Sequence, residues 1–184
     1  MYNILGIDLE TTGFKHEGPD RIIEICMILF EWDGKSLKHK DSLVTLVNPR
    51  RDIPEKITEI TGISNEDVRD AKFFEEHADK VVELMNNADL VVAHNVGFDV
   101  PFLMSELHRV GSSVGSRALF CTMLESKPWA KADCSQPKLG DLCFACGVKY
   151  EPDKAHAAKY DVIKMMQCFV FGIKNKLFKT EVLK

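Results

Sequence analysis

Two carboxylates stand where the first apolar run of the chain ends, in the segment GIDLETTGF (residues 6–14). Asp8 and Glu10 are two residues apart, so on a strand their side chains project from the same face, about 7 Å apart. Charge is costly to remove from water unless it is paired, so we expect positive partners near both groups. Two divalent cations held about 3.5–4 Å apart would fit between two such carboxylates.

Two further acidic motifs lie later in the chain, AHNVGFD (residues 93–99) and HAAKYD (residues 156–161). Asp99 could be the N-cap of the helix that follows, a further ligand, or both. His156 and Asp161 are five residues apart, about 140° out of phase on a helix. We therefore expect His156 in a loop or first turn and Asp161 on the last helix. Taken alone, this pair is typical of chance surface residues.

The elements that must position these motifs follow from hydrophobic periodicity and turn signals. Strands are predicted at residues 2–10, 21–32, 38–47, 89–95 and 117–122. Helices are predicted after Pro54 up to Gly62, from a cap at residues 64–67, and at residues 73–88, 101–111 and about 155–176. The order predicts an α/β fold with a mixed five-stranded sheet, three antiparallel strands followed by parallel strands, and helices on both faces.

Such sheets carry their sites at the carboxyl ends of strands, which is where Asp8 and Glu10 stand. We see no linker or repeat in the sequence, so residues 1–184 are expected to form one domain. The N-terminus lacks a basic region, and no run approaches the roughly 20 apolar residues of a membrane span. A cytoplasmic protein without membrane contact is therefore expected.

The net charge of −4 argues against a broad basic surface for nucleic acid. It does not exclude nucleic acid, because two divalent cations would bring four positive charges to the acidic site. The six cysteines are scattered through core-like segments, which suits free thiols in a reducing compartment. Cys143 and Cys146 form a CxxC on a helix-like run, either as a core face or as part of a zinc site with Cys134 or His156.

The motifs DLETTGF, AHNVGFD and HAAKYD, in this order, resemble the three motifs of the DEDDh exonucleases. This ribonuclease H-like family includes the proofreading subunit of bacterial replicative DNA polymerase. The resemblance extends to RIIEI, NPRRDIPEKITEITGI, CTMLESK and KLGDLCFACGV, and so covers nearly the whole chain. Three motifs with matching intervening segments are a far more specific signal than one.

The resemblance implies a role for each motif residue. Asp8, Glu10 and Asp161 would hold two Mg²⁺ or Mn²⁺ ions, with Asp99 ligating directly or through water, as suits hard cations and oxygen ligands. His156 would be the general base, because an imidazole titrates near neutrality and can take a proton from the attacking water. The implied substrate-binding residues are Leu9, Thr11, Thr12, Thr61, His94, Asn95 and Phe98.

Two positions near the motifs are less defined. Glu24 interrupts an apolar strand and is either a carboxylate that supports the metal ligands or an exposed strand residue. Val162 stands where related proteins often have Ala after the last Asp, which adds volume without touching a ligand.

The activity that the resemblance implies is metal-dependent 3′→5′ exonuclease action that releases nucleoside 5′-monophosphates from single-stranded DNA 3′ ends. A DNA polymerase is a further partner that it suggests. ETTG together with TGI is more similar to the proofreading branch than to the RNA-directed branches. One alternative keeps the chemistry and takes RNA 3′ ends. Another is a catalytically silent relative that binds nucleic acid or a polymerase, although intact acidic motifs disfavour it.

Overall fold

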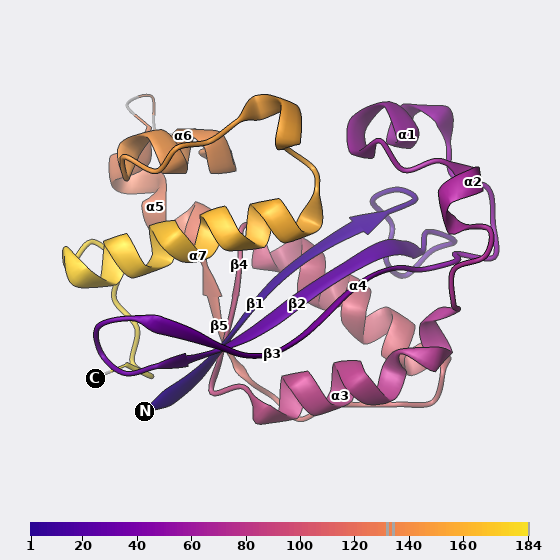
Figure 1. Ribbon diagram of the computed structural model, residues 1–184, viewed down its shortest axis with the longest axis horizontal. Helices are drawn as coiled ribbons and strands as arrows, with labels where there is room; N and C mark the ends of the chain where they lie inside the picture. Colours follow the sequence, from indigo (N-terminus) through magenta and orange to yellow (C-terminus); the bar gives the residue numbers. More distant parts are fainter. Residues whose placement is uncertain (132, 134, 184) are drawn as a thin grey trace.

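A mixed five-stranded sheet of order β3-β2-β1-β4-β5 forms the centre of the molecule (Figure 1). The computed structural model describes residues 1–131, 133 and 135–183. The strands are β1 (Tyr2–Thr11), β2 (Ile22–Trp32), β3 (Leu37–Leu46), β4 (Leu90–Ala93) and β5 (Ala118–Cys121). The pairs β1–β2 and β2–β3 are antiparallel, and β4 runs parallel to both β1 and β5. The predicted sheet is therefore confirmed.

The helical elements follow the strands in the order that periodicity predicts. They are α1 (Glu55–Thr61), α2 (Asn65–Val68), η1 (Phe74–Glu76), α3 (Ala78–Asn87), α4 (Val96–Arg109), α5 (Thr122–Ala130), α6 (Leu139–Ala145), η2 (Pro152–Lys154) and α7 (Ala158–Lys174). Gly62, at a φ of 73°, ends α1, and Ser64 caps α2 in a capping box with Asp67. Both of these signals were read correctly from the sequence.

Helices cover both faces of the sheet because β1 alternates its side chains between them. Leu5, Ile7 and Leu9 point into a core shared with α3 and α4. Ile4 points into the opposite core, which α6 and α7 close. Asp8 and Glu10 continue the second set, so they emerge on the face of α7, beyond the end of that core.

Gly6 sets how closely α7 approaches the sheet. A Cβ at this position would lie 2.9 Å from Val162 Cγ1 and 3.0 Å from Met166 Cγ, closer than real Cβ contacts. The missing side chain thus allows α7 to cross directly over β1. Val162, the bulkier residue noted in the sequence, is completely buried against this glycine. The contact fixes Asp161, its neighbour, beside the end of β1.

The structure corrects three element boundaries. Helix α4 begins at Val96, five residues before the predicted start, with Asn95 as its N-cap in the left-handed conformation. Asp99 therefore lies inside the helix, and its possible role as N-cap is wrong. The predicted helix 73–88 is divided at His77 into η1 and α3. The last helix starts three residues later than expected.

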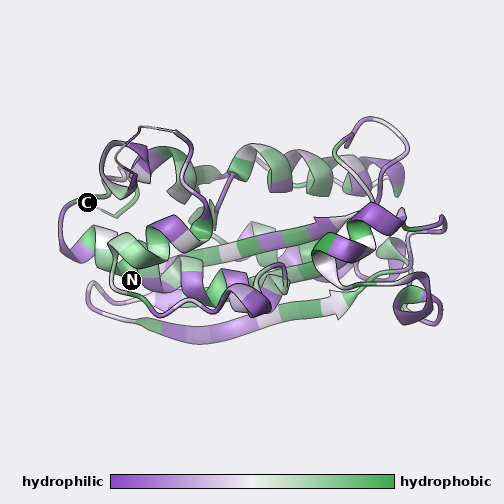
Figure 2. Cartoon of the chain, turned by 90° about the horizontal axis from the view of Figure 1, so that it is seen from above, coloured by the Kyte–Doolittle hydropathy of each residue, from purple (hydrophilic) through white to green (hydrophobic). Residues whose placement is uncertain are grey.

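Helix α5 was not predicted, since Pro128 and a mixed apolar pattern obscure its periodicity. The edge strand β3 carries a charged stretch, Lys38 to Asp41, coloured purple in Figure 2. Charges on an edge strand discourage pairing with another chain. Among the described residues, no helix is long and apolar enough to cross a membrane.

The five described cysteines are free and buried, as expected for core thiols. Cys143 and Cys146 face the core of α6 and α7, and the Cys143 and Cys168 sulfurs are 3.6 Å apart. This supports the interpretation of the CxxC as a core helix face. Cys134, which the alternative zinc site invoked, lies outside the described residues.

Candidate active site

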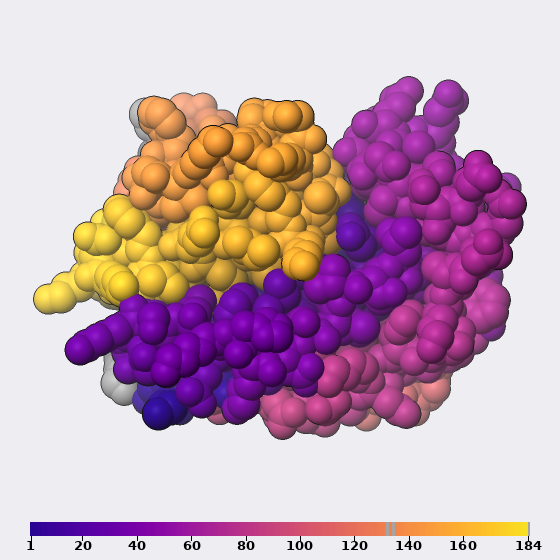
Figure 3. Space-filling model, viewed as in Figure 1, coloured from indigo at the N-terminus to yellow at the C-terminus, as the bar shows by residue number. Residues whose placement is uncertain are grey.

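A pocket of about 1200 Å³ opens at the carboxyl ends of β1 and β4. Figure 3 shows it as a hollow between the orange surface around α6 and the purple surface of α1, with indigo atoms of the N-terminal strand at its base. β1 and β4 are parallel, so the motifs that follow or end them meet at one edge of the sheet.

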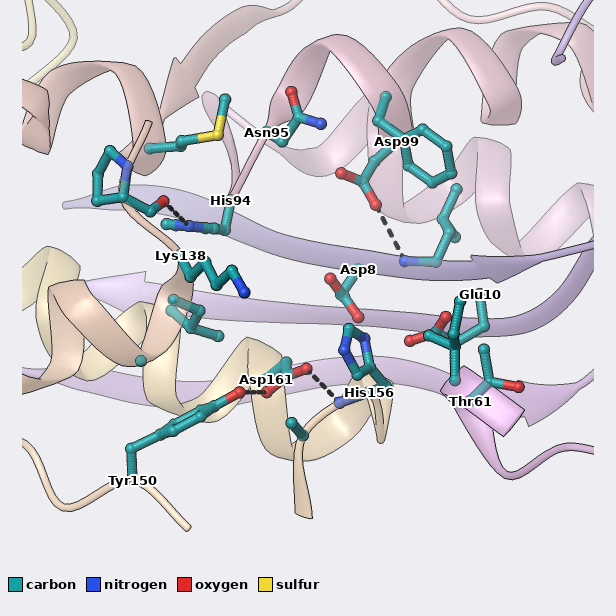
Figure 4. Close-up of a pocket in the computed structure, with 18 of the residues that line it drawn as sticks. Asp8, Glu10, Thr61, His94, Asn95, Asp99, Lys138, Tyr150, His156 and Asp161 are labelled. Carbon is teal, nitrogen blue, oxygen red and sulfur yellow. Dashed lines mark hydrogen bonds between the residues drawn. The ribbon is translucent and has the colours of Figure 1, made fainter. Parts of the chain in front are cut away.

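All five residues predicted to be catalytic line this pocket. Asp8 and Glu10 come from β1, Asp99 from α4, and His156 and Asp161 from the start of the α7 segment. In Figure 4 the His156 ring lies below the Asp8 side chain and between Asp161 and Glu10, with Asp99 above them. Segments about 90 and 150 residues apart in sequence thus meet in one cavity.

Asp99 is held by the strand that carries the acidic pair. The backbone N–H of Leu9 donates to Asp99 Oδ1 at 3.0 Å, and the Asp99 side chain is almost completely buried. Leu9 therefore contributes its backbone to the site, while its side chain belongs to the core below. A carboxylate fixed by one oxygen leaves its other oxygen available to a cation or water.

Asp161 has two partners from the segment before α7. The His156 backbone N–H donates to Asp161 Oδ2 at 2.9 Å, and the Tyr150 hydroxyl donates to Asp161 Oδ1 at 3.1 Å. His156 has a φ of 63°, a strained conformation for a residue with a side chain. It lies before the helix and is exposed, so the expectation of a non-helical His156 is confirmed.

The pKa of each clustered acid is raised, and neighbouring acids add to the shift for Asp8 and Glu10. Burial is the main cause for each of them. It raises the pKa of Glu10 to about 8 and that of Asp99 to about 7. The pKa of Asp8 is raised well above its usual value, first by burial and then by Asp99 and Glu10. The pKa of Asp161 is also raised by burial, against the hydrogen bonds that it accepts. The ionised forms of these carboxylates therefore need positive charge nearby to be stable.

Glu24 proves to be a supporting carboxylate. It pairs directly opposite Glu10 in the β1–β2 register, and its Oε2 accepts a hydrogen bond from the Ala158 N–H at 3.2 Å. Ala158 is the first residue of α7, where unpaired N–H groups favour negative charge. Glu24 thereby fastens the start of α7 to β2, and burial raises its pKa.

The oxygen-rich donor set suits divalent cations such as Mg²⁺ or Mn²⁺. In the part of the chain that the structure describes, no three His, Cys, Asp or Glu side chains converge closely enough to hold one ion.

Six of the seven predicted substrate-binding residues line the pocket: Leu9, Thr11, Thr61, His94, Asn95 and Phe98. Thr12 does not; it is buried, accepts a hydrogen bond from the Arg21 N–H at 3.0 Å and contacts Asp20 through its hydroxyl. Its position favours a role in shaping the loop after β1.

The His94 side chain can contact a ligand through the face or edge of its ring but not through its nitrogen atoms. Nε2 donates to the Pro137 carbonyl at 3.0 Å, and Nδ1 is 3.0 Å from the Thr122 hydroxyl. Burial lowers the pKa of His94, so the ring stays neutral. Both polar atoms are thus committed to the protein, and any substrate contact would use the ring face or edge.

The loop between β1 and β2 is fastened to α4 by a buried ion pair. Arg21 contacts both carboxylate oxygens of Glu106, at 2.6 and 2.8 Å, and Arg109 contacts the same group at 3.1 Å. Glu106 is only 1% exposed. The loop holds Phe14 at the pocket, where its ring is 6.2 Å from that of Phe98.

Sequence reasoning missed Tyr150, and it left Lys138 as one of several lysines that either contact phosphates or are solvated surface residues. Figure 4 shows the Lys138 amine directed toward the acidic pocket and the Tyr150 hydroxyl bonded to Asp161. Neither residue lies in a motif, so no local signal separates them from ordinary surface residues. Lys138 lies immediately before α6, and Tyr150 lies between α6 and α7, so their place at the pocket depends on how these segments pack beside β1.

A family model described as Exonuclease matches residues 5–169, so the chain belongs to this exonuclease family. DNA polymerase III subunit epsilon of Rickettsia conorii is 37% identical over 177 residues, which cover 94% of this chain and 75% of that protein. The chain spans only about a tenth of the length of the first curated relatives that it matches.

Two solved structures show the same fold at low sequence identity. Exonuclease I of E. coli, in a zinc-bound complex with single-stranded DNA, has a TM-score of 0.80 and 17% identity over 97% of this chain and 42% of that chain. The nuclease domain of 3′hExo, a DEDDh family member bound to rAMP, has a TM-score of 0.76 and 20% identity over 95% of this chain and 93% of that chain. The predicted fold and the resemblance to exonucleases are therefore confirmed.

Proposed function

We propose that this chain is a divalent-cation-dependent 3′→5′ exonuclease that releases nucleoside 5′-monophosphates from single-stranded nucleic acid, with DNA preferred. The observation that carries the proposal is the convergence of four carboxylates and His156 on one open pocket. Membership of the exonuclease family supports it. An acidic pocket repels phosphate, so it serves a nucleic-acid ligand only when cations compensate its charge.

In this proposal Asp8, Glu10 and Asp161 hold the cations, with Asp99 as a further or water-mediated ligand. When bound, the cations would neutralise the acids, polarise the scissile phosphate and stabilise the leaving 3′ oxygen. His156 accepts the proton of the attacking water. Its exposed ring and backbone tie to Asp161 suit that task, because a general base must reach the water without being locked by other contacts.

The terminal nucleotide would lie against the wall made by β1 and α4. Leu9, Asn95 and Phe98 line this wall, and the Phe98 ring is supported by Phe102 at 4.9 Å. An aromatic ring held in place by another suits packing on a sugar or base. Thr61 faces the same space from α1, with its hydroxyl donated to the Ile57 carbonyl.

Preference for DNA rests on the names of relatives. The epsilon relative is a DNA polymerase subunit and the exonuclease I complex holds single-stranded DNA, whereas the 3′hExo domain holds rAMP. A DNA polymerase is the partner that the epsilon relative suggests. Co-elution with the replicative polymerase of the source organism in size-exclusion chromatography tests this part of the proposal.

The direct test is Mg²⁺-dependent release of mononucleotides from matched DNA and RNA strands, single-stranded and duplex. Asp8→Ala should slow release by about 10³-fold, because the cations supply several kcal/mol of transition-state stabilisation. Asp70→Ala, at an exposed acid outside the pocket, is the matched control. If wild type releases nothing and Asp8→Ala binds DNA equally well, the chain is a binding module. Faster release from RNA would reverse the substrate preference.

A further inference from the structure

Phe144 is the most exposed large apolar side chain that the structure describes, with 90% of its surface in contact with solvent. Its helix is firmly seated, because Leu139, Leu142 and Cys143 on the same short helix are buried in the core. The ring therefore cannot turn inward without unseating α6. Single exposed apolar residues are common, so exposure alone would mean little.

The position of Phe144 shows that its exposed ring belongs to the wall of the pocket. Gly140, Asp141 and Phe144 form one face of α6, at spacings of one and four residues, and all three line the pocket. The opposite face of the helix supplies the core. The Tyr150 ring packs beside this pocket face, 3.3 Å from where a Gly140 Cβ would lie. Phe144 thus stands in the wall of the site and not on a remote surface.

The pocket is larger than one nucleotide needs. Its volume of about 1200 Å³ exceeds the roughly 300–1,000 Å³ that ordinarily holds a small ligand. Phe14 and Phe98 supply aromatic surface on the wall of β1 and α4, where the terminal nucleotide is proposed to bind. Phe144 supplies aromatic surface on a separate wall, which α6 forms. Lys138 directs its amine into the same pocket, where a strand phosphate would be attracted.

We propose that Phe144 stacks on a base of single-stranded nucleic acid upstream of the scissile phosphate, and so sets the preference of the site for strands over single nucleotide esters. The inference rests on the proposed function and deepens it by naming a specificity-determining residue. Stacking on an aromatic ring accepts every base, because each base has a π face. It requires an unpaired strand, because duplex bases are stacked on one another.

The kinetic test compares two substrates of wild type and Phe144→Ala. One is a single-stranded oligonucleotide, and the other is the p-nitrophenyl ester of thymidine 5′-monophosphate, which has no upstream base. The ratio of kcat/KM on the oligonucleotide to kcat/KM on the ester should fall roughly 5- to 150-fold in Phe144→Ala, since stacking is worth about 1–3 kcal/mol per base. Phe144→Trp should restore the ratio, and Phe144→Leu should restore little of it.

Leu124→Ala is the matched control, since this residue of α5 is 52% exposed and does not line the pocket. It should leave the ratio unchanged. Thermal unfolding of each variant checks that the fold is intact. An intact fold is expected, because the exposed Phe144 ring is not part of the core. A direct readout is 2-aminopurine placed at successive positions from the 3′ end. Wild type should quench its fluorescence at one upstream position, and Phe144→Ala should abolish that quenching alone.

The outcomes separate the two proposals. An active wild type whose Phe144→Ala variant keeps both the ratio and the quenching overturns the stacking role and leaves the exonuclease proposal standing. A wild type that cleaves neither substrate overturns the exonuclease proposal and the inference with it. An equal loss on ester and oligonucleotide also contradicts the inference, because it would show a general disturbance of the site.

Discussion

At the scale of single residues, the carboxyl group of Glu10 links the site to the stability of the fold. Glu10 faces Glu24 across the β1–β2 pair, and its pKa rises from 4.5 to about 8. Between these pH values the folded protein keeps a proton that the unfolded chain has lost. Stability of the metal-free protein therefore falls as pH rises from about 5 to 8.

Glu10→Gln should remove the part of this dependence that Glu10 contributes, while the other acids with raised pKa values keep theirs. In EDTA at pH 5 the variant and wild type should melt at similar temperatures, because the position is neutral in both. At pH 8 the variant should melt higher, by about 2–4 °C for each 1 kcal/mol of relieved repulsion. Calorimetry at the two pH values measures the difference, with the exposed Glu59→Gln as control. Equal melting temperatures at pH 8 would contradict the shifted pKa.

His156 carries the second residue-scale prediction. His156→Ala should lower kcat by about 10²–10⁴-fold, the usual contribution of a general base, while leaving Mn²⁺ affinity nearly unchanged. Single-turnover rates and Mn²⁺ titration measure the two quantities separately. His39→Ala, on the edge strand β3, is the control for removal of an exposed imidazole. A large loss of Mn²⁺ affinity would instead assign His156 to the metal site.

At the scale of elements, the crossing of α7 over β1 decides where Asp161 stands. The glycine at position 6 permits the crossing, and Glu24 and Tyr150 fasten the beginning of the helix and its preceding segment. The acidic pair on β1 and the acid on α7 are thus brought together by backbone packing. Attraction between acids cannot do this, since they repel one another.

Gly6→Ala should destabilise the protein by about 1–3 kcal/mol, because overpacking displaces α7 from the sheet. Activity should fall more than the unfolded fraction explains, since Asp161 moves with the helix. Val162→Ala removes the nearest atom and should restore part of both quantities in the double variant. Denaturant unfolding and kcat measure the coupling. Gly115→Ala, where only the tip of Arg117 is near, is the control. Strictly additive effects would contradict the proposed contact.

At the scale of the whole molecule, a net charge of −4 makes the proposed cations the main expected source of attraction for the proposed nucleic-acid strand. The chain matches the exonuclease family over residues 5–169. That residues 1–184 form one exonuclease domain stays a prediction, as do the roles assigned to the individual site residues.

Binding of a nucleic-acid strand should therefore depend more on divalent cations than on the concentration of monovalent salt. Each phosphate neutralised on a single strand contributes about 0.7 to the slope of log K against log salt, so we expect a slope below about 3 in magnitude. Removal of the divalent cations with EDTA should weaken strand binding at least tenfold. Fluorescence anisotropy with the His156→Ala variant and Mg²⁺ measures both with little cleavage. A slope above 6, or binding indifferent to EDTA, would point to a basic surface instead.

The sequence by itself determined those features that depend on residues close together in the chain. Alternating apolar residues located the five strands to within a few residues, and the two-residue period put Asp8 and Glu10 on one face. Gly62 and Ser64 marked helix ends because their local conformations are specific. The residues predicted as ligands and base were proposed from the resemblance of acidic motifs that are each contiguous in the chain, and their roles stay predictions.

Only the tertiary structure decided what depends on distant packing. Asp99 entered a helix because Asn95 turns the chain at the sheet edge, and Thr12 was turned away from the pocket toward Arg21. The contacts of Glu24 with Ala158 and of Tyr150 with Asp161 join segments that no periodicity relates. Local pattern carries no information about such distances, which are fixed when helices close over the sheet.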